Sequence, residues 1–144
     1  RKMNLGNDNE VEQELFFAVK SKRFSEASRI LHDNSHSIST HSKKIISYIG
    51  AGPRHRHKWT IFHWVAYHGN ATPISLLQAL LHLLKTLSEK KILLHCDSFG
   101  DTPLRVATEY APEDSILMLL SACPEAAKVA NRRGNTPLHS ILSP

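Results

Sequence analysis

The sequence has 144 residues, of which 41% are hydrophobic and 22% are charged, and its formal net charge at pH 7 is +5. This length fits one compact domain or a short repeat array, and the composition excludes a disordered chain. The richest apolar run, 74–84, contains Gln78 and His82, so it is too short and too polar to cross a bilayer.

Charge is unevenly distributed along the chain. Residues 34–88 contain no Asp or Glu, but they carry six of the Lys and Arg residues and seven of the ten histidines. A surface formed by this stretch should be positive and should attract an anionic partner. The densest part is the run Pro53-Arg-His-Arg-His-Lys58, which is followed directly by Trp59.

Apolar residues at helical spacing, together with capping residues, predict helices in pairs. The expected ranges are 10–20 and 24–32, then 61–68 and 73–88, then 103–110 and 112–122, and finally 137–142. Thr72 is expected to cap the helix that begins at Pro73. The sequence therefore predicts an all-α protein built from helical hairpins.

The last third of the chain repeats itself at an interval of 34 residues. Asp97-Ser-Phe-Gly-Asp-Thr-Pro-Leu104 aligns with Asn131-Arg-Arg-Gly-Asn-Thr-Pro-Leu138, with identical Gly, Thr, Pro and Leu. In each phrase the Gly suits a turn with positive φ, the Thr can cap a helix, and the Pro fits the first helical position. Each phrase therefore predicts a turn, then a cap, then a helix.

Earlier copies of the repeat are fainter. The phrase at 60–69 keeps Thr60 and His63 but has Ile61 in place of Pro and Lys58 in place of the turn Gly. The first copy lacks the Thr-Pro phrase, as terminal repeats often do. The chain is therefore interpreted as a single domain, 1–144, whose parts are copies at 10–33, 57–94, 97–130 and 131–144, the last cut short, and an insertion at 34–56.

Two further features depart from a regular array. The segment 90–96 is expected to lengthen the second copy beyond the ordinary repeat. The fourth copy has no second helix, so Leu138 and Ile141 should be exposed, and we expect more chain or another subunit to cover them.

Thr136-Pro-Leu-His139 matches the signature of ankyrin repeats, and Thr102-Pro-Leu-Arg-Val-Ala107 matches it with Arg in place of His. The chain therefore resembles the ankyrin-repeat family. The phrase Cys123-Pro-Glu-Ala-Ala127 is similar to a subtype of that repeat frequent in algae and protists. The resemblance implies a solenoid of helix-turn-helix repeats with short hairpin-like turns. It also implies that the His two residues after the Pro position, His63 or His139, bonds to the capping Thr.

The resemblance further implies a non-catalytic scaffold that binds another protein, as one subunit of a larger assembly, and that needs no cofactor. Ankyrin repeats bind through their turn tips and through the exposed side of each first helix. The matching positions here are Arg56, His57, Trp59, Tyr67, His68, Ser98, Phe99, Asp101, Glu109, Tyr110, Arg132, Arg133 and Asn135. Phe99 stands out, because a turn tip offers an aromatic ring little apolar surface to bury against.

A second hypothesis uses the acid-free stretch 34–88 as a binding surface for nucleic acid or another polyanion. Arg54, Arg56 and Lys58 would contact phosphate groups and Trp59 would stack on a base. The opposing interpretation is a solvated loop whose Trp anchors the next helix, since no nucleic-acid-binding motif accompanies the cluster.

Other chemistry finds little support in the sequence. The histidines lack the ligand spacing of a zinc site, so no metal is expected. No nucleophile elbow, phosphate loop or zinc-protease motif is present, so the chain is not expected to be an enzyme. Cys96 and Cys123 do not form a C-x-x-C pair and are expected to be two buried thiols in a reducing, intracellular compartment.

Overall fold

A computed structural model of the protein describes residues 8–33 and 58–142. All regular structure in these two ranges is helical, which confirms the predicted all-α class for them. The α-helices are α1 (Asp8–Lys20), α2 (Phe24–Asp33), α4 (Ile61–His68), α5 (Ile74–Leu87), α6 (Pro103–Tyr110), α7 (Glu113–Ala122) and α8 (Pro137–Leu142). Three short 3₁₀ segments are η2 (Gly69–Ala71), η3 (Lys90–Leu94) and η4 (Pro124–Lys128). The insertion 34–56 lies outside the described residues.

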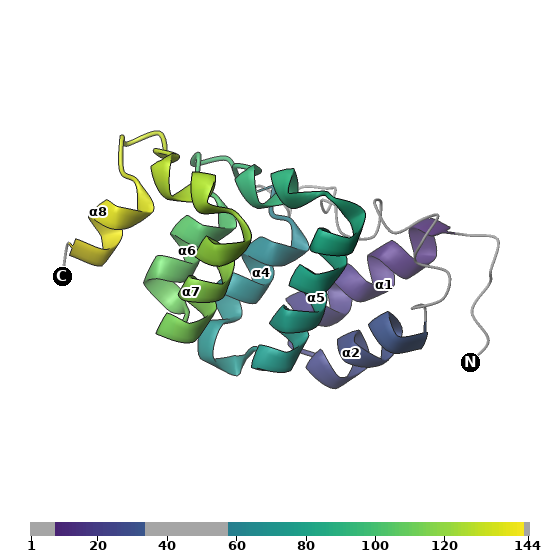
Figure 1. Ribbon diagram of the computed structural model, residues 1–144. Helices are drawn as coiled ribbons and strands as arrows, with labels where there is room; N and C mark the ends of the chain where they lie inside the picture. The colour runs from purple at the N-terminus through teal and green to yellow at the C-terminus, as the bar shows by residue number, and fades with distance from the viewer. Residues whose placement is uncertain (1–7, 34–57, 143–144) are drawn as a thin grey trace.

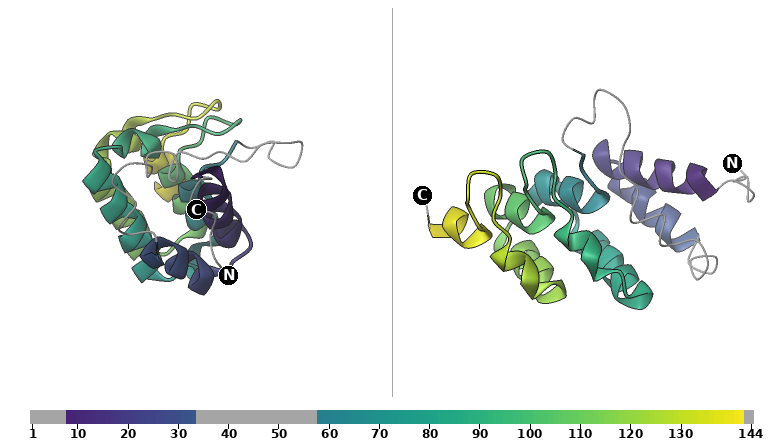
Figure 2. Two further views of the ribbon diagram at one scale, coloured as in Figure 1. Left: turned by 90° about the vertical axis from the view of Figure 1, so that its right-hand side faces the viewer. Right: turned by 90° about the horizontal axis from the view of Figure 1, so that it is seen from above.

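The helices form two layers, which are seen best from above (Figure 2, right). One layer holds α1, α4, α6 and α8 in chain order, and the other holds α2, α5 and α7 (Figure 1). Each helix contacts the next one in its own layer, so successive hairpins stack side by side. The core fills the space between the layers with fully buried side chains such as Leu15, Phe62 and Leu80, each worth about 1.5–3 kcal/mol on burial.

Capping follows the predicted phrases at α4 and α6. The Thr60 and Thr102 side chains accept hydrogen bonds from the backbone N–H groups three residues later, and Pro103 begins α6. Thr72 does not cap α5, so that prediction is wrong. Its hydroxyl instead donates to the Val65 carbonyl oxygen at 3.0 Å, which also accepts the N–H of Gly69 at the end of α4.

Three equivalent turn positions, each two residues before a Thr, share a left-handed backbone. Gly100 and Gly134 both have a φ of 82°, as predicted, and Lys58 has a φ of 56°. A non-glycine residue in this region costs roughly 1–2 kcal/mol. The second copy therefore keeps the turn geometry although it lost the glycine.

The segment 90–96 is not the cause of the longer second copy. Its 3₁₀ segment η3 starts 34 residues before η4, the same interval as the sequence repeat, and η3 contacts η4. The additional length lies earlier, in η2 and in α5, which has 14 residues where α7 has 10. The sequence could not distinguish these options because the Leu-rich run around α5 has no internal stop signal.

Exposure corrects one prediction and confirms another. Cys123 is buried, but Cys96 is exposed, because it lies in the link between η3 and the following turn. Leu138 and Ile141 on α8 are exposed, as expected, at 58% and 57%. Within the described residues, none of the helices has the length and apolar character that a bilayer span requires.

Candidate functional site

The turns that precede α6 and α8 are held by the same side-chain geometry. In each turn a side-chain oxygen of the first residue, Asp97 or Asn131, accepts hydrogen bonds from the N–H groups two and four residues later, at 2.9–3.0 Å. The backbone N–H of that first residue donates to the carbonyl oxygen four residues later. Asp and Asn are suited to this role because a short side-chain oxygen reaches its own backbone. The turns are therefore rigid platforms.

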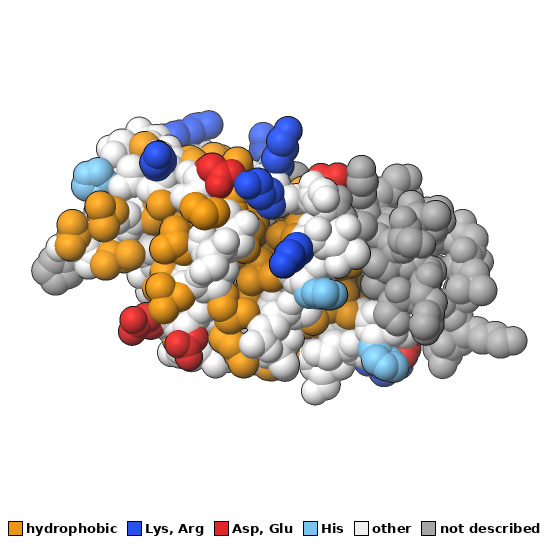
Figure 3. Space-filling model, in the orientation of Figure 1, with side chains coloured by type: hydrophobic (Ala, Val, Ile, Leu, Met, Phe, Trp, Pro, Cys, Tyr) orange, Lys and Arg blue, Asp and Glu red, His pale blue; other side chains and the backbone are white. Residues whose placement is uncertain are grey.

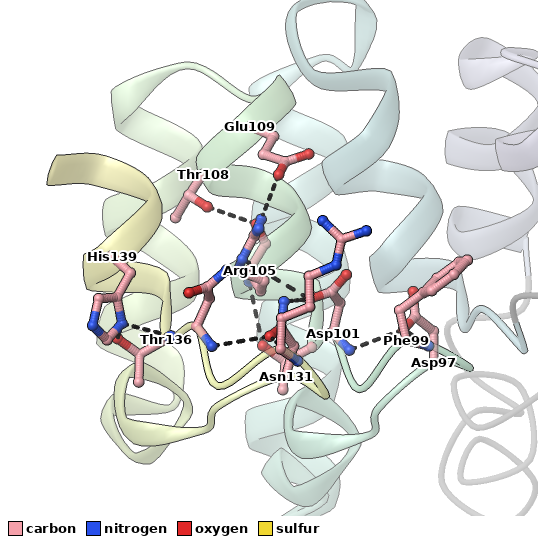
Figure 4. A network of polar contacts seen from close by, with 12 residues as sticks. Asp97, Phe99, Asp101, Arg105, Thr108, Glu109, Asn131, Thr136 and His139 are labelled. Atoms are coloured by element: carbon pink, nitrogen blue, oxygen red, sulfur yellow. Dashed lines mark hydrogen bonds and ion pairs between the residues drawn. The ribbon is translucent and has the colours of Figure 1, made fainter. Parts of the chain in front are cut away.

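Neighbouring turns are also bonded to one another (Figure 4). The Arg132 N–H donates to the Phe99 carbonyl oxygen at 3.0 Å, and the Asn131 side-chain amide donates to the Asp101 carboxylate at 3.0 Å. Gly100 makes this approach possible, since a Cβ there would lie 2.9 Å from the Arg132 nitrogen. Burial raises the pKa of the Asp101 carboxyl, and the hydrogen bond from Asn131 opposes that effect.

The turn of the second copy is linked to the next one in the same way. The Trp59 indole N–H donates to the second carboxylate oxygen of Asp97 at 2.8 Å. Trp59 and Asp101 both stand directly before a capping Thr, so each of the two links joins that position to the first residue of the next turn. The platform thus continues from the second copy into the fourth.

The buried His63 side chain links α4 to the turn before α6. Its Nδ1 accepts a hydrogen bond from the Thr60 N–H at 3.2 Å, so its Nε2 carries the proton and donates to the Asp101 carbonyl oxygen at 2.9 Å. Burial lowers the pKa of His63 to about 4, although the bond to Asp101 works in the opposite direction. His139 makes the same contact with Thr136, at 3.0 Å. The predicted His–Thr bond is therefore confirmed in both copies.

An aromatic cluster covers the outer side of α4. The Trp59 ring lies 4.6 Å from the Trp64 ring and 5.2 Å from the Tyr67 ring, measured between centroids. Tyr67 also contacts Tyr110 on α6, at 4.9 Å. The Lys20 ammonium at the end of α1 lies 5.5 Å from the centroid of the Trp64 ring, which is a cation–π contact. Tyr67 and Tyr110 are 41% and 50% exposed, so the cluster presents aromatic surface to solvent.

A groove of about 500 Å³ opens between this cluster and the third turn. Phe99 stands at its edge with 55% of its surface exposed. Arg105 crosses its floor and forms an ion pair with Glu109 at 2.8 Å, and it lies 3.9 Å from Asp101. The groove therefore combines apolar rings with one arginine, Arg105, and three carboxylates, those of Asp97, Asp101 and Glu109.

A smaller, polar hollow of about 410 Å³ lies on the other side of Arg105, between α6 and α8. Its lining includes Glu109, Asn135 and His139. Within the described residues, the Ser140 hydroxyl beside it is buried without a hydrogen-bond partner. The two openings share Arg105 and Glu109, so a ligand that spans both would meet aromatic rings first and polar groups next.

The structure places many of the sequence-predicted residues around these two openings. Six of them line the larger groove: Trp59, Tyr67, Phe99, Asp101, Glu109 and Tyr110. Asn135 lines the polar hollow, Arg132 and Arg133 are exposed on the fourth turn, and Ser98 is half-buried in the third. No observation tests whether these residues contact a partner, so their role stays a prediction.

His68 is used inside the protein. Its Nε2 donates to the Lys20 carbonyl oxygen at 2.9 Å, and its ring packs edge-on against Phe24. Partial burial lowers the pKa of His68, and the bond to Lys20 opposes that effect. This histidine therefore joins the first hairpin to the second.

Four groove residues were missed from the sequence: Trp64, Asp97, Arg105 and Val106. Trp64 stands three residues before Tyr67, so helical spacing alone places the two on one face. Arg105 replaces the repeat histidine, and that substitution was visible as the mismatch in the signature. Both signals were local, but neither indicated a shared groove.

The alternative anion-binding surface is largely untested. Arg54, Arg56 and His57 lie outside the described residues, and Lys58 is exposed in the turn before α4. In the two described ranges, no group of three or more His, Cys, Asp or Glu side chains is placed to hold a metal ion.

Among the comparisons with known proteins, only the one with solved structures finds a similarity. No protein-family model matches the sequence, and no curated protein matches it. Among solved structures, it is similar to one chain of the complex between the predatory endopeptidase Bd0816 from Bdellovibrio bacteriovorus and the immunity protein Bd3460. The TM-score is 0.51 and the identity 15%, over 88% of this chain and 72% of that chain. At this identity the likeness shows a shared fold alone, and no activity transfers with it.

Proposed function

We propose that this chain is a divergent ankyrin-repeat protein that binds another protein and catalyses no reaction. The Thr-Pro-Leu phrases support the family, and so do the two equivalent Asx turns and the His–Thr bonds at the starts of α4 and α8. The second copy supports it further, because Lys58 adopts the left-handed turn that the other copies make with glycine.

The single observation that carries the binding role is the groove beside Phe99. An exposed ring on a rigid turn, a cluster of further rings and an arginine lie around one opening of about 500 Å³. Aromatic and Arg residues are the types enriched at binding hot spots. Backbone hydrogen bonds on both sides already order the turn that carries Phe99, so binding would cost little additional conformational entropy.

The chemistry of the opening also indicates what kind of segment would fit. Rings from Trp59, Tyr67 and Tyr110 suit an apolar or aromatic side chain of the partner. The exposed Arg132 and Arg133 on the adjoining turn would favour acidic residues next to it. We therefore propose a partner segment with an apolar anchor followed by negative charge.

Site-specific photocrosslinking in an extract of the producing cells would test the proposal. A photoreactive residue at Tyr110 should crosslink to one dominant protein, whereas the same residue at Lys128, on η4, should not. The double variant Phe99→Ala, Arg132→Glu should abolish the Tyr110 crosslink and leave circular dichroism and the melting temperature unchanged, because both side chains are exposed.

The matched control reverses one charge elsewhere, as Lys128→Glu, and should retain the crosslink. If the Tyr110 crosslink survives the double variant, the binding face has been assigned to the wrong side of the molecule. The mass of the crosslinked product also distinguishes a single partner from a larger assembly.

A further inference from the structure

A further groove lies on the opposite layer, which holds α5 and α7. It has a volume of about 870 Å³ and runs between α5 and α7, with η3 closing one end. Figure 3 shows this face, on which apolar side chains gather over the α5–α7 region. Its apolar lining includes Leu81 and Met118, both half-buried, and Leu117, which is 50% exposed.

The groove has the dimensions of a docking site for a helix. Its lining runs along α5 from Gln78 to the C-cap residue Ser88, which is roughly 15 Å, or three helical turns. It is open to the surface along this length and bounded by two helices of the same layer. A third helix laid into such a groove would bury its apolar face against both neighbours.

Both lysines that line the groove stand at one of its ends, where Glu125 pairs with Lys90. Lys85 and Lys90 line the end where α5 finishes, and the residues that line the groove include no Asp or Glu. Glu113 and Asp114 lie in the first turn of α7, at the other end. Figure 3 shows Lys and Arg side chains along the upper margin of the apolar surface, with some acidic side chains among them, and further Asp and Glu side chains at its lower left.

Lys85 is the cation available to a partner. Lys90 is already paired with Glu125 at 3.1 Å, whereas Lys85 has no acidic partner among the described residues and is exposed. An acidic group beside Lys85 would add a favourable contact without breaking an existing one. A helix carries acidic residues most favourably in its own first turn, near the positive end of its dipole.

From the apolar lining and this charge pattern, we propose that the groove between α5 and α7 binds an amphipathic helix of a partner protein. The helix runs antiparallel to α5 and α7, so that its first turn lies at the lysine end. Its apolar face packs on Leu81, Leu117 and Met118, and acidic residues in its first turn lie beside Lys85. This surface is separate from the turns and Phe99, so it stands or falls independently of the function proposed above.

A pair of synthetic peptides tests the proposal on the complete chain of 144 residues. Both are fluorescein-labelled amphipathic helices of about four turns with Leu along one face. One carries Glu in its first turn, and its twin carries Lys there. Fluorescence anisotropy measures binding of each peptide to the protein and to single variants. Lys85→Glu and Leu117→Ser change exposed side chains, so both variants should fold, as circular dichroism would verify.

The acidic peptide should bind about tenfold more tightly than its basic twin, and Lys85→Glu should reverse that preference. Leu117→Ser should weaken both peptides about tenfold, because it removes apolar contact area. Lys22→Glu, a matched reversal in the turn between α1 and α2, should change neither. The difference between the twins should shrink as salt is raised.

Several results would overturn the proposal. One is equal binding of the twins, and another is binding that does not depend on Leu117. Failure of both peptides to bind counts against it as well. Displacement of the peptide by dodecanoate would assign the groove to an anionic amphiphile instead. A Leu117-dependent dimer in sedimentation analysis would assign it to a second copy of the chain.

Discussion

Gly100 and Gly134 form a matched pair for testing how the turns are held together. Both have a φ of 82° in equivalent turns, so alanine at either position meets the same backbone strain. Their surroundings differ. A Cβ at Gly134 would have no atom within 4 Å, whereas one at Gly100 would lie 2.9 Å from the Arg132 nitrogen and 3.1 Å from the Asn131 Cα.

The expected magnitudes follow from these contacts. Strain in the left-handed region costs about 1–2 kcal/mol, and the stiffer unfolded chain of an alanine variant returns about 0.4–1 kcal/mol. Gly134→Ala should therefore lower the free energy of unfolding by about 1 kcal/mol. Gly100→Ala must also push two backbones apart, which lengthens the bond from Arg132 to the Phe99 carbonyl and the bond from Asn131 to Asp101. At about 1 kcal/mol for each bond, its total cost should be about 3 kcal/mol.

Urea unfolding, followed by the fluorescence of the two tryptophans, would measure both variants under one condition. The difference between Gly100→Ala and Gly134→Ala should be about 2 kcal/mol, which is well above the error of the method. Equal destabilisation would refute the reasoning, because it would mean that contact between the turns adds nothing to backbone strain. A change in the slope of the transition would instead indicate that the variant no longer unfolds in one step.

Further predictions address single contacts of the platform. The pKa of His63 is about 4 in the folded protein and 6.5 in the unfolded chain, so the unfolded chain gains the proton first as the pH falls. The free energy of unfolding should therefore drop by up to about 3 kcal/mol between pH 6.5 and 4. Urea titrations of His63→Gln should show a flatter profile over that range. Lys58→Gly should raise the free energy of unfolding by about 0.5–1 kcal/mol, since glycine removes the left-handed strain. A melting temperature that stays unchanged or falls would contradict this. Asp97→Ala should cost about 2–3 kcal/mol and Asp97→Asn about 1 kcal/mol, because Asn keeps the bonds within the turn and loses mainly the Trp59 bond. Equal losses in thermal unfolding would mean that the bonds within the turn contribute nothing, and an unchanged Asp97→Asn variant would mean the same of the Trp59 bond. If the stretch 34–88 binds polyanions, the protein should stay on heparin at low salt and elute steeply as salt rises, and failure to be retained would exclude that function.

The helices themselves could be predicted from the sequence because their signals are local. A Thr, a Pro and apolar residues at intervals of three and four specify where α6 and α8 begin, and the observed bounds agree with the prediction. The glycines before those helices also predicted positive φ correctly. These are properties of neighbouring residues, which the chain order preserves.

The candidate site could be predicted only in part. Phe99 and Tyr110 were assigned to a binding surface from their repeat positions, and they do line one groove. Arg105 and Trp64 were missed, because their place in that groove depends on how α4 packs beside α6. The link from Trp59 to Asp97 spans 38 residues, and no local pattern could indicate it.

By itself, then, the sequence determined the helical class, the repeat and the composition of the turns, since these depend on interactions within a few residues. Tertiary structure alone decided the rest. Lys58 adopts a glycine-like backbone conformation that its residue type disfavours, and the longer α5 accounts for much of the additional length of the second copy. The groove beside Phe99 and the groove between α5 and α7 exist only because helices distant in the chain lie side by side, and stacking, not propensity, brings them together.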